Sequence, residues 1–213
     1  MLDSKVLIVG VGGLGSPVAM YLAAAGVGNL ILVDFDQVEL SNLQRQIVHD
    51  TTQLGQDKVI SAKKKLERLN PNVKITTINQ KLSLEHFNVD VVVDCSDNFA
   101  TRFMVNKVCI EKGIPLVSGA ALRWGGQVAV FNNKNGPCYQ CLYDNIEEQA
   151  ETCSESGIIA PLVGIIGSIQ ALEVIKVILN LGEFGYLLLL DAHKMQWRKL
   201  KLHKDPSCGV CGL

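Results

Sequence analysis

A mixed α/β sheet covered by helices is the fold class that the sequence predicts, and three observations lead to it. Apolar segments rich in β-branched residues alternate with segments of helical spacing across residues 1–112. The first such segment, Lys5–Val9, is apolar on both faces, as in a strand buried within a parallel sheet. After Gly113, the strand-like segments 115–118 and 126–131 follow each other closely, with residues 123–125 directly before the second, and such a short connection suits antiparallel neighbours. We therefore expect three layers, with a parallel first half and a mixed or antiparallel second half.

The first half is expected to contain four strands and three helices. A helix follows the first strand, with Ser16 as its N-cap, Pro17 in its first turn and Gly26 as its left-handed end. Regular alternation of strands and helices is typical of a Rossmann-like doubly wound sheet. The other elements expected are strands at residues 30–33, 73–78 and 89–94 and helices at Lys58–Leu69 and residues 100–112.

The second half is expected to complete the same single domain, residues 1–213. Strands are predicted at residues 115–118, 126–131, 186–190 and 196–202, and a long polar surface crossover at residues 132–158. Residues 162–179 are apolar nearly all round, which predicts a central buried helix. Residues 1–112 would then form a nucleotide-binding half, and residues 113–213 a half that holds a partner and a metal.

Composition excludes several classes of protein. The chain has 213 residues, of which 48% are hydrophobic and 19% charged, and its formal net charge of -1 argues against a nucleic-acid partner. Residues 6–33 carry no charge, but glycines and Pro17 divide them into short elements, so we expect no membrane span and no cleavable signal. Seven cysteines without such a signal favour metal or thiol chemistry in the cytoplasm over disulfides.

The clearest motif is a glycine-rich turn between the first strand and the first helix. Gly10, Gly12 and Gly15 have the G-x-G-x-x-G spacing, with Gly13 inside it, so backbone N–H groups and a helix N-terminus can hold a phosphate. Asp34 ends the next strand, where a carboxylate can accept both ribose hydroxyls. A nucleotide is therefore expected, either ATP or the NAD or FAD of an oxidoreductase.

Cationic and acidic side chains farther along the chain favour ATP. Arg45 and Lys58 would supply two positive charges beside a triphosphate, and Asp97, at the end of a later strand, could hold Mg²⁺. Attack of a carboxylate on an α-phosphate needs this set, because charge on the phosphates must be neutralised. We accordingly predict catalytic roles for Arg45, Lys58 and Asp97.

With these motifs in order, the chain resembles the ThiF/MoeB/HesA group of sulfur-carrier-protein adenylyltransferases, which are similar to ubiquitin-activating enzymes. The resemblance covers nearly the whole chain and implies an ATP site in which Asp34 binds the ribose and Asn42, Arg45 and Lys58 contact the phosphates. Asp97 would coordinate Mg²⁺, and Asp36 and Gln46 are also expected at the nucleotide. The motifs that carry it are Gly10–Gly15, Asp34–Asp36, Ser41–Gln46, Lys58, Asp94–Asn98, Cys138-x-x-Cys141 and Cys208-x-x-Cys211.

The resemblance also implies a substrate and partners. The substrate is a small ubiquitin-like sulfur carrier whose C-terminal Gly-Gly carboxylate becomes an acyl-adenylate, with a cysteine desulfurase or rhodanese as sulfur donor and a second copy in a homodimer. Members of the group usually carry a helix before the first strand, and its arginine reaches the partner subunit's nucleotide site. This chain enters its first strand after Met1–Ser4, so we expect slower adenylation and weaker dimerisation.

Five cysteines are candidates for chemistry. Two Cys-x-x-Cys pairs suit a tetrahedral structural Zn²⁺ that pins the crossover to the C-terminus, with free thiols or a redox pair as alternatives; the resemblance favours zinc. Cys153 lies in the crossover at a position that forms a covalent bond to the carrier in some relatives, although Glu151 and Glu155 disfavour its thiolate. The expected zinc ligands are Cys138, Cys141, Cys208 and Cys211.

The remaining polar and aromatic residues are expected to be structural. Cys95 and Cys109 should fill core space, Trp124 and Trp197 should pack, and the four histidines have no ligand or triad spacing, so solvated or capping roles are expected. Residues 120–127 are expected to border a groove for the carrier tail, because Gly125 and Gly126 would let another backbone approach.

Three alternative functions stay open at this point. They are a nicotinamide- or flavin-dependent oxidoreductase, a non-catalytic nucleotide-binding scaffold, and a relative that activates a small molecule or a modified tRNA. Between the two carrier pathways, residues 144–145 and 196–198 favour thiamine over molybdopterin.

Overall fold

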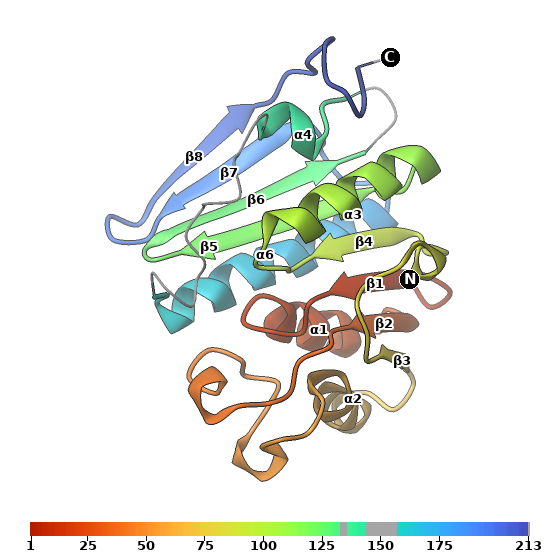
Figure 1. Ribbon diagram of the computed structural model, residues 1–213, viewed down its shortest axis with the longest axis vertical. Helices are drawn as coiled ribbons and strands as arrows, with labels where there is room; N and C mark the ends of the chain where they lie inside the picture. The colour runs from red at the N-terminus through yellow and green to blue at the C-terminus, as the bar shows by residue number, and fades with distance from the viewer. Residues whose placement is uncertain (133–135, 144–156, 213) are drawn as a thin grey trace.

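The computed structural model describes residues 1–132, 136–143 and 157–212, and these form a single eight-stranded sheet with helices on both faces (Figure 1). The strand order is β3-β2-β1-β4-β5-β6-β7-β8. The first five strands in this order are parallel, and β6, β7 and β8 are antiparallel to their neighbours. The fold class predicted from the sequence is therefore confirmed.

The parallel part of the sheet reverses its strand order between β1 and β4. From β1 (Lys5–Val9) the chain passes through α1 (Gly15–Ala24) to β2 (Asn29–Val33), then through α2 (Lys58–Leu69) to β3 (Lys74–Ile78). It then returns to the other side of β1 as β4 (Val91–Asp94), followed by α3 (Phe99–Lys112). Ligands of such sheets bind at the carboxyl ends of the strands where the order reverses.

The antiparallel part extends the sheet beyond β4. Its strands are β5 (Leu116–Leu122), β6 (Gly125–Phe131), β7 (Tyr186–Asp191) and β8 (Gln196–Lys201). The helices described in this half are α4 (Tyr139–Leu142) and α6 (Ala160–Ile178). Within the described residues, short 3₁₀ helices lie in the connections at Leu40–Asn42, Thr51–Gln53 and Leu84–His86.

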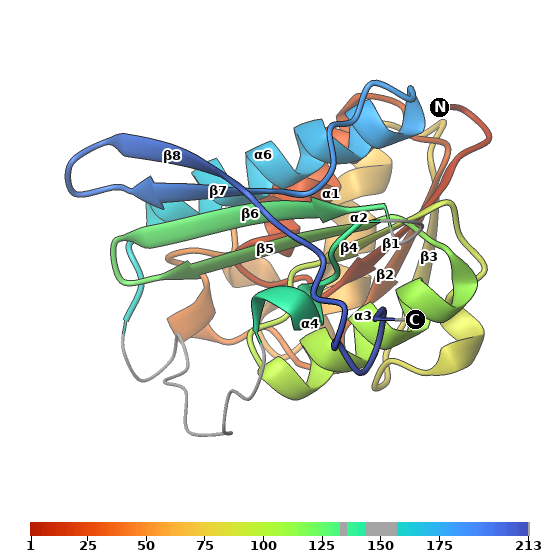
Figure 2. The same cartoon turned by 90° about the horizontal axis from the view of Figure 1, so that it is seen from above.

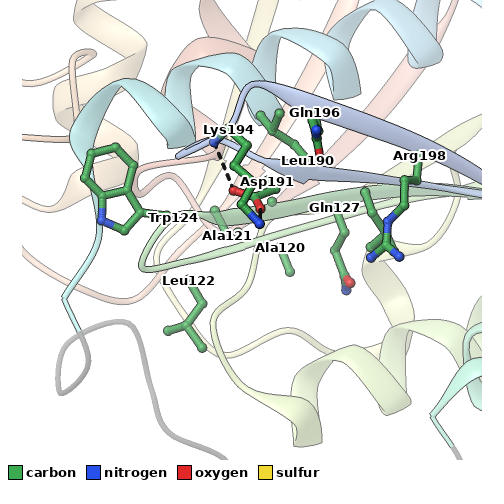
Figure 3. Close-up of a pocket in the computed structure, with 13 residues that line it drawn as sticks. Ala120, Ala121, Leu122, Trp124, Gln127, Leu190, Asp191, Lys194, Gln196 and Arg198 are labelled. Carbon is green, nitrogen blue, oxygen red and sulfur yellow. Dashed lines mark hydrogen bonds and ion pairs between the residues drawn. The ribbon is translucent and has the colours of Figure 1, made fainter.

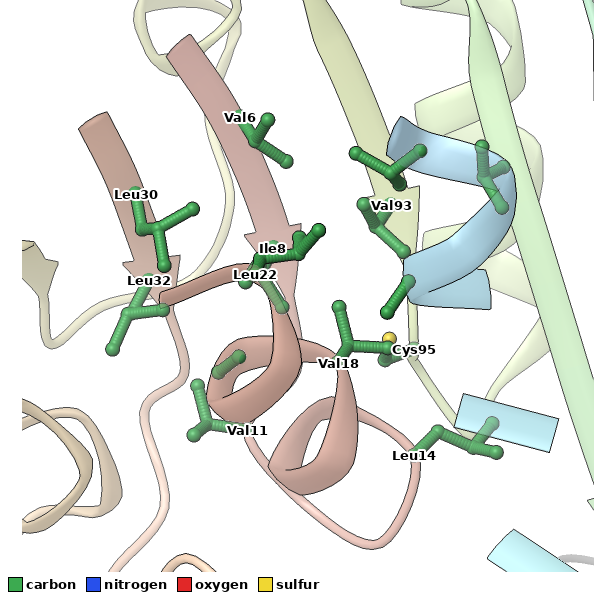
Figure 4. Packing of buried hydrophobic residues seen from close by; sticks show 14 of the residues in the cluster. Val6, Ile8, Val11, Leu14, Val18, Leu22, Leu30, Leu32, Val93 and Cys95 are labelled. Carbon is green, nitrogen blue, oxygen red and sulfur yellow. The ribbon is translucent and has the colours of Figure 1, made fainter. Parts of the chain in front are cut away.

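The two faces of the sheet hold separate hydrophobic clusters. Helices α1, α2 and α6 cover one face, and α3 and α4 cover the other (Figure 2). Val6 and Ile8 of β1 point toward α1, where they meet Val18 and Leu22 (Figure 4). Leu7 alternates to the α3 face, so β1 is apolar on both sides, as its sequence predicted.

Three local expectations are wrong. Ser16 is not the N-cap of α1, because the helix already begins at Gly15 and the Ser16 hydroxyl is buried without a partner among the described residues. The helix α6 is not fully enclosed, since Leu172 is 56% exposed whereas Gln170 is completely buried. β5 is also longer than predicted, because pairing with β6 continues to Leu122.

The helix α6 is the one candidate membrane span among the described residues, by length and composition. Its window has a mean hydropathy of 1.7, but half of that window is buried inside the domain. The buried half packs on α1, β5 and β6. Its apolar character is thus used within the fold.

Candidate active site

The glycine-rich turn between β1 and α1 has the geometry of an anion cradle. Gly10 has φ = +88°, and a Cβ on Gly15 would lie 2.0 Å from the carbonyl oxygen of Gly10, so both positions require glycine. The N–H groups of Gly12 and Gly13 donate to no acceptor within the described residues. Two unpaired donors ahead of a helix N-terminus are suited to a phosphate.

The carboxyl end of β2 supplies two aspartates beside this turn. Asp34 accepts the N–H of Val11 at 2.7 Å and the N–H of Asp36 at 2.9 Å, which ties β2 to the glycine-rich turn. Burial raises the pKa of Asp34, while Lys58 and the two N–H donors partly oppose that shift. Asp36, which is half exposed, forms an ion pair of 2.7 Å with Lys58.

Lys58 is a buried cation at the start of α2. Its side chain is only 7% exposed, and its backbone N–H donates to the carbonyl oxygen of Asp36 at 2.9 Å. Lys58 also lines a cavity at the carboxyl ends of the parallel strands. A buried cation with one half-exposed partner can be used by an anionic ligand at low desolvation cost.

Of the site residues predicted in the segment after β2, Arg45 and Gln46 line the cavity and Asn42 does not. Arg45 is half-buried, with Nη1 3.2 Å from the carbonyl oxygen of Ser41, and it lines the cavity together with the buried Gln46. The amide oxygen of Gln46 has no partner within the described residues. Asn42 does not line the cavity; its Oδ1 lies 3.4 Å from the N–H of Glu39, which caps the 3₁₀ turn.

Asp97 projects from the loop between β4 and α3. Asp94 anchors this loop, because its Oδ1 accepts the N–H of Ser96 at 3.0 Å and the Ser96 hydroxyl at 2.6 Å. Gln170 of α6 adds a 2.9 Å bond to the carbonyl oxygen of Asp94. The Asp97 carboxylate is exposed and accepts no hydrogen bond from the described residues. It is therefore available to a ligand.

These segments enclose a cavity of about 800 Å³ at the carboxyl ends of β1, β2 and β4. Arg45, Lys58 and Asp97, which are far apart in the chain, all line it. The volume lies within the range of nucleotide-sized ligand sites. Of the predicted nucleotide residues, those that also line the cavity are Gly10, Gly12, Gly13, Asp34, Asp36 and Gln46.

The cavity has a further wall that the sequence analysis missed. Arg102 of α3 is buried, donates to the carbonyl oxygen of Ser96 and lies beside Tyr139 of α4. Burial lowers the pKa of Arg102, but Asp94 and Tyr139 more than offset this effect, so the guanidinium stays charged. Burial raises the pKa of Tyr139 to about 12. No sequence signal separates this arginine from an ordinary helix-surface cation.

A groove on the antiparallel strands leads into the cavity. It has a volume of about 810 Å³, and Ala120, Leu122 and Gln127 line both the groove and the cavity. Strand register places Ala120, Gln127, Leu189 and Arg198 in one row across β5 to β8. Figure 3 shows Ala120, Gln127 and Arg198 of this row. An extended peptide lying along this row would reach the nucleotide cavity at its end.

One of the two glycines of this groove differs from expectation. A Cβ on Gly126 would lie 2.5 Å from Ile166 of α6, so Gly126 is small in order to pack against that helix rather than to admit a partner. Gly125 points the other way and meets only the carbonyl oxygen of Leu122, at 3.6 Å. Trp124 and Trp197 are 47% and 43% exposed, so the prediction that they are packing residues is wrong.

The four cysteines of the two Cys-x-x-Cys pairs form one cluster. Their Sγ atoms all lie within 4.8 Å of one another, with separations of 3.3, 3.7 and 4.0 Å for three of the pairs. Four thiolates at 2.3 Å from a tetrahedral Zn²⁺ would be about 3.8 Å apart. Asn106 donates to Cys138 and accepts the N–H of Tyr139, so this cluster is connected to the cavity wall.

The other cysteines and the histidines divide into clear groups. Cys95 and Cys109 are buried, and burial raises the pKa of both thiols, which agrees with core roles. Cys153 lies outside the described residues. His86 accepts the N–H of Ser83 and caps a 3₁₀ turn as expected, but His49 is buried and contacts the glycine-rich turn, so the expected solvated or capping role is wrong there.

Comparison with known proteins identifies the family of the chain. The model of the ThiF family matches residues 1–210. The chain belongs to the ThiF family. It is 49% identical over 221 residues to the molybdopterin-synthase adenylyltransferase of Escherichia coli (strain K12), and the match covers 99% of this chain and 88% of that protein.

Two further comparisons agree with this assignment. The chain is 42% identical over 219 residues to the sulfur carrier protein ThiS adenylyltransferase of Escherichia coli (strain K12), with coverage of 100% and 87%. The crystal structure of E. coli MccB with ATP shares the fold at a TM-score of 0.88 and 24% identity, covering 100% of this chain and 68% of that one. As a ThiF-family member with adenylyltransferase relatives, the chain is a nucleotidyltransferase.

Proposed function

We propose that this ThiF-family enzyme uses ATP to adenylate the C-terminal carboxylate of a small ubiquitin-like sulfur carrier protein. The observation that carries the proposal is the continuity of the groove on β5–β8 with the cavity that holds Arg45, Lys58 and Asp97. The names of the relatives, which act on molybdopterin synthase and on ThiS, support the same class of acceptor.

Each group around the cavity has a role in this reaction. The N–H groups of Gly12 and Gly13 and the side chains of Arg45 and Lys58 bind the phosphates, and Asp34 accepts hydrogen bonds from the ribose. The carrier carboxylate attacks the α-phosphorus, the bond from the α-phosphorus to the bridging oxygen breaks, and pyrophosphate leaves. The cationic side chains stabilise the charge that moves onto that leaving group.

Metal ions fit two places in this scheme. The exposed carboxylate of Asp97 would hold Mg²⁺, which neutralises phosphate charge when bound. The cluster of four cysteines would hold a structural Zn²⁺, because its Sγ separations agree with tetrahedral coordination. Zinc would join α4 to the C-terminal segment and thereby support the wall that carries Tyr139.

The other partner assignments remain predictions. Helices α1 and α6 pack together and leave Tyr21 and Leu172 more than half exposed, which supports a homodimer through this face. A cysteine desulfurase or rhodanese as sulfur donor, a cytoplasmic location and a role for Cys153 rest on the family resemblance alone. The thiamine pathway also stays a prediction. The identity to the molybdopterin-synthase adenylyltransferase of Escherichia coli is 49%, whereas that to its ThiS adenylyltransferase is 42%, so the relatives do not favour thiamine.

A direct test is to weigh candidate carriers after incubation with the enzyme, ATP and Mg²⁺. A carrier of either pathway that gains the mass of AMP, together with carrier-dependent exchange of pyrophosphate into ATP, would establish the activity and choose the pathway. Asp97→Ala should abolish the adduct, whereas Asp90→Ala, an exposed aspartate before β4, should not. Binding of ATP and carrier with no adduct would instead establish a non-catalytic scaffold.

A further inference from the structure

A buried histidine contacts the glycine-rich turn at the same residue as Asp34. His49 is 6% exposed, and its Nε2 lies 3.1 Å from the carbonyl oxygen of Val11. The N–H of Val11 donates to Asp34 at 2.7 Å. Val11 is thus fixed at both its N–H and its carbonyl group, by side chains from two different segments.

The hydrogen bond to Val11 has a consequence for the next residue. The peptide unit that joins Val11 to Gly12 is planar and trans, so its C=O and N–H point in opposite directions. A carbonyl directed at the buried His49 therefore directs the N–H of Gly12 away from His49. Gly12 lines the nucleotide cavity, and its N–H is unpaired within the described part of the chain.

The protonation of the ring follows from its partners. A carbonyl oxygen can only accept, so the hydrogen bond to Val11 requires the proton on Nε2. Burial, with a contribution from Lys58, lowers the pKa of His49 to about 4, so the ring is neutral near pH 7 and Nδ1 is an acceptor. The Ser61 hydroxyl lies 2.7 Å from Nδ1 and 2.7 Å from Oε1 of Gln53, so these two acceptors compete for its one proton.

We infer that His49 is a positioning residue for ATP binding, because its bond to Val11 aims the N–H of Gly12 at a phosphate. This role rests on the proposed function, since it requires a phosphate in the cavity. His49 itself is separated from the ligand by the glycine-rich turn, so its effect on binding is indirect. It follows that removing this single donor should weaken the binding of nucleotides only through their phosphates.

Two substitutions separate the contacts of the ring. The amide nitrogen of glutamine can occupy the place of Nε2, so His49→Gln keeps a donor to Val11. That of asparagine reaches only the place of Nδ1, so His49→Asn loses the donor. Ser61→Ala is the matched control, because it removes the other polar contact of the ring and leaves the bond to Val11.

The experiment measures dissociation constants for ATP and adenosine by calorimetry, with thermal unfolding of each variant. We expect His49→Asn to weaken ATP about tenfold and adenosine less than twofold, the size expected for one lost hydrogen bond. His49→Gln should recover ATP affinity to within threefold of wild type. Ser61→Ala should lower the unfolding temperature and leave ATP affinity within twofold.

Several outcomes would overturn the role of His49 while leaving the proposed function intact. The first is an unchanged ATP affinity in His49→Asn. The second is a loss of adenosine affinity in His49→Asn equal to its loss of ATP affinity, and the third is a loss of ATP affinity in Ser61→Ala equal to that in His49→Asn. A wild-type enzyme that fails to bind ATP would instead refute the proposed function. If His49→Asn does not fold, the amide proton of Gly12 in the wild type decides, since it should shift with ATP and not with adenosine.

Discussion

Replacing Lys58 by methionine tests the electrostatic basis of the proposed reaction. Methionine keeps the apolar length of the side chain and removes its charge from a position that is 7% exposed. Two unit charges about 4 Å apart at an effective dielectric of 20 interact by about 4 kcal/mol. The phosphate must compete with Asp36 for the ammonium of Lys58, which reduces this interaction energy. We therefore expect Lys58→Met to lose about 3 kcal/mol of transition-state stabilisation, or roughly a hundredfold in rate.

Stability should change little in the same variant. Asp36 is half exposed and stays solvated when its partner is removed, and replacement of a buried cation by an apolar group avoids a desolvation cost. We expect a change of less than about 1 kcal/mol, or about 3 °C in the midpoint of thermal unfolding for a chain of this size. Activity and stability should thus separate.

The assay is carrier-dependent exchange of pyrophosphate into ATP, with thermal unfolding measured on the same preparations. Lys65→Met is the matched control, because it makes the same change on an exposed residue of α2 that does not line the cavity. Exchange within threefold of wild type in Lys58→Met would refute the role of this charge. A fall of more than about 8 °C in its unfolding midpoint would show that the loss of activity is a loss of fold.

Three further predictions concern the glycine-rich turn, the buried histidine and the cysteine cluster. Gly15→Ala should lower the free energy of unfolding by about 3 kcal/mol, because the new Cβ would lie 2.0 Å from the oxygen of Gly10; Gly164→Ala, with nothing within 4 Å, should raise it by about 0.5–1 kcal/mol. Urea unfolding of both variants checks this pair, and equal effects would contradict it. The pKa of His49 is about 4 in the folded state against 6.5 unfolded, so between these values the unfolded chain binds more protons and stability falls as the pH is lowered from 6.5. This loss of unfolding free energy is at most about 3 kcal/mol. It should be absent from His49→Gln, and a pH dependence of stability in that variant equal to that of wild type would contradict the prediction. Asn106→Ala removes the amide that donates to a cluster thiolate and should weaken zinc about tenfold in a chelator competition, whereas an affinity within twofold of wild type would show that this donor is not needed.

Local patterns predicted the parallel half of the fold well. The bounds of Lys5–Val9 and Lys58–Leu69 agree with the structure, because each segment has a strong periodicity of its own and clear end signals. Gly26 adopts the predicted left-handed conformation at the end of α1, with φ = +78°. Ser16 was predicted wrongly since the turn from β1 enters the helix at Gly15, which places Ser16 inside the helix and buries it.

Tertiary pairing decided elements that carry weak local signals. Residues 119–121 are glycine and alanine, which have low strand propensity, yet they continue β5 because β6 pairs with them. Gln170 is buried in the apolar helix α6 because its amide bonds to the carbonyl oxygen of Asp94. Neither feature can be read from the spacing of residues along the chain.

By itself the sequence determined the fold class, the nucleotide motif and the two cysteine pairs, because these depend on periodicity and on short spacings that are preserved along the chain. Only the tertiary structure brought Arg45, Lys58 and Asp97 to one cavity and joined that cavity to the groove on the antiparallel strands. Arg102 and His49 acquired their places in the same way, since burial and partners come from segments distant in the chain. Local sequence patterns indicate the chemistry that a side chain offers, whereas packing between distant segments decides which side chains line the same cavity.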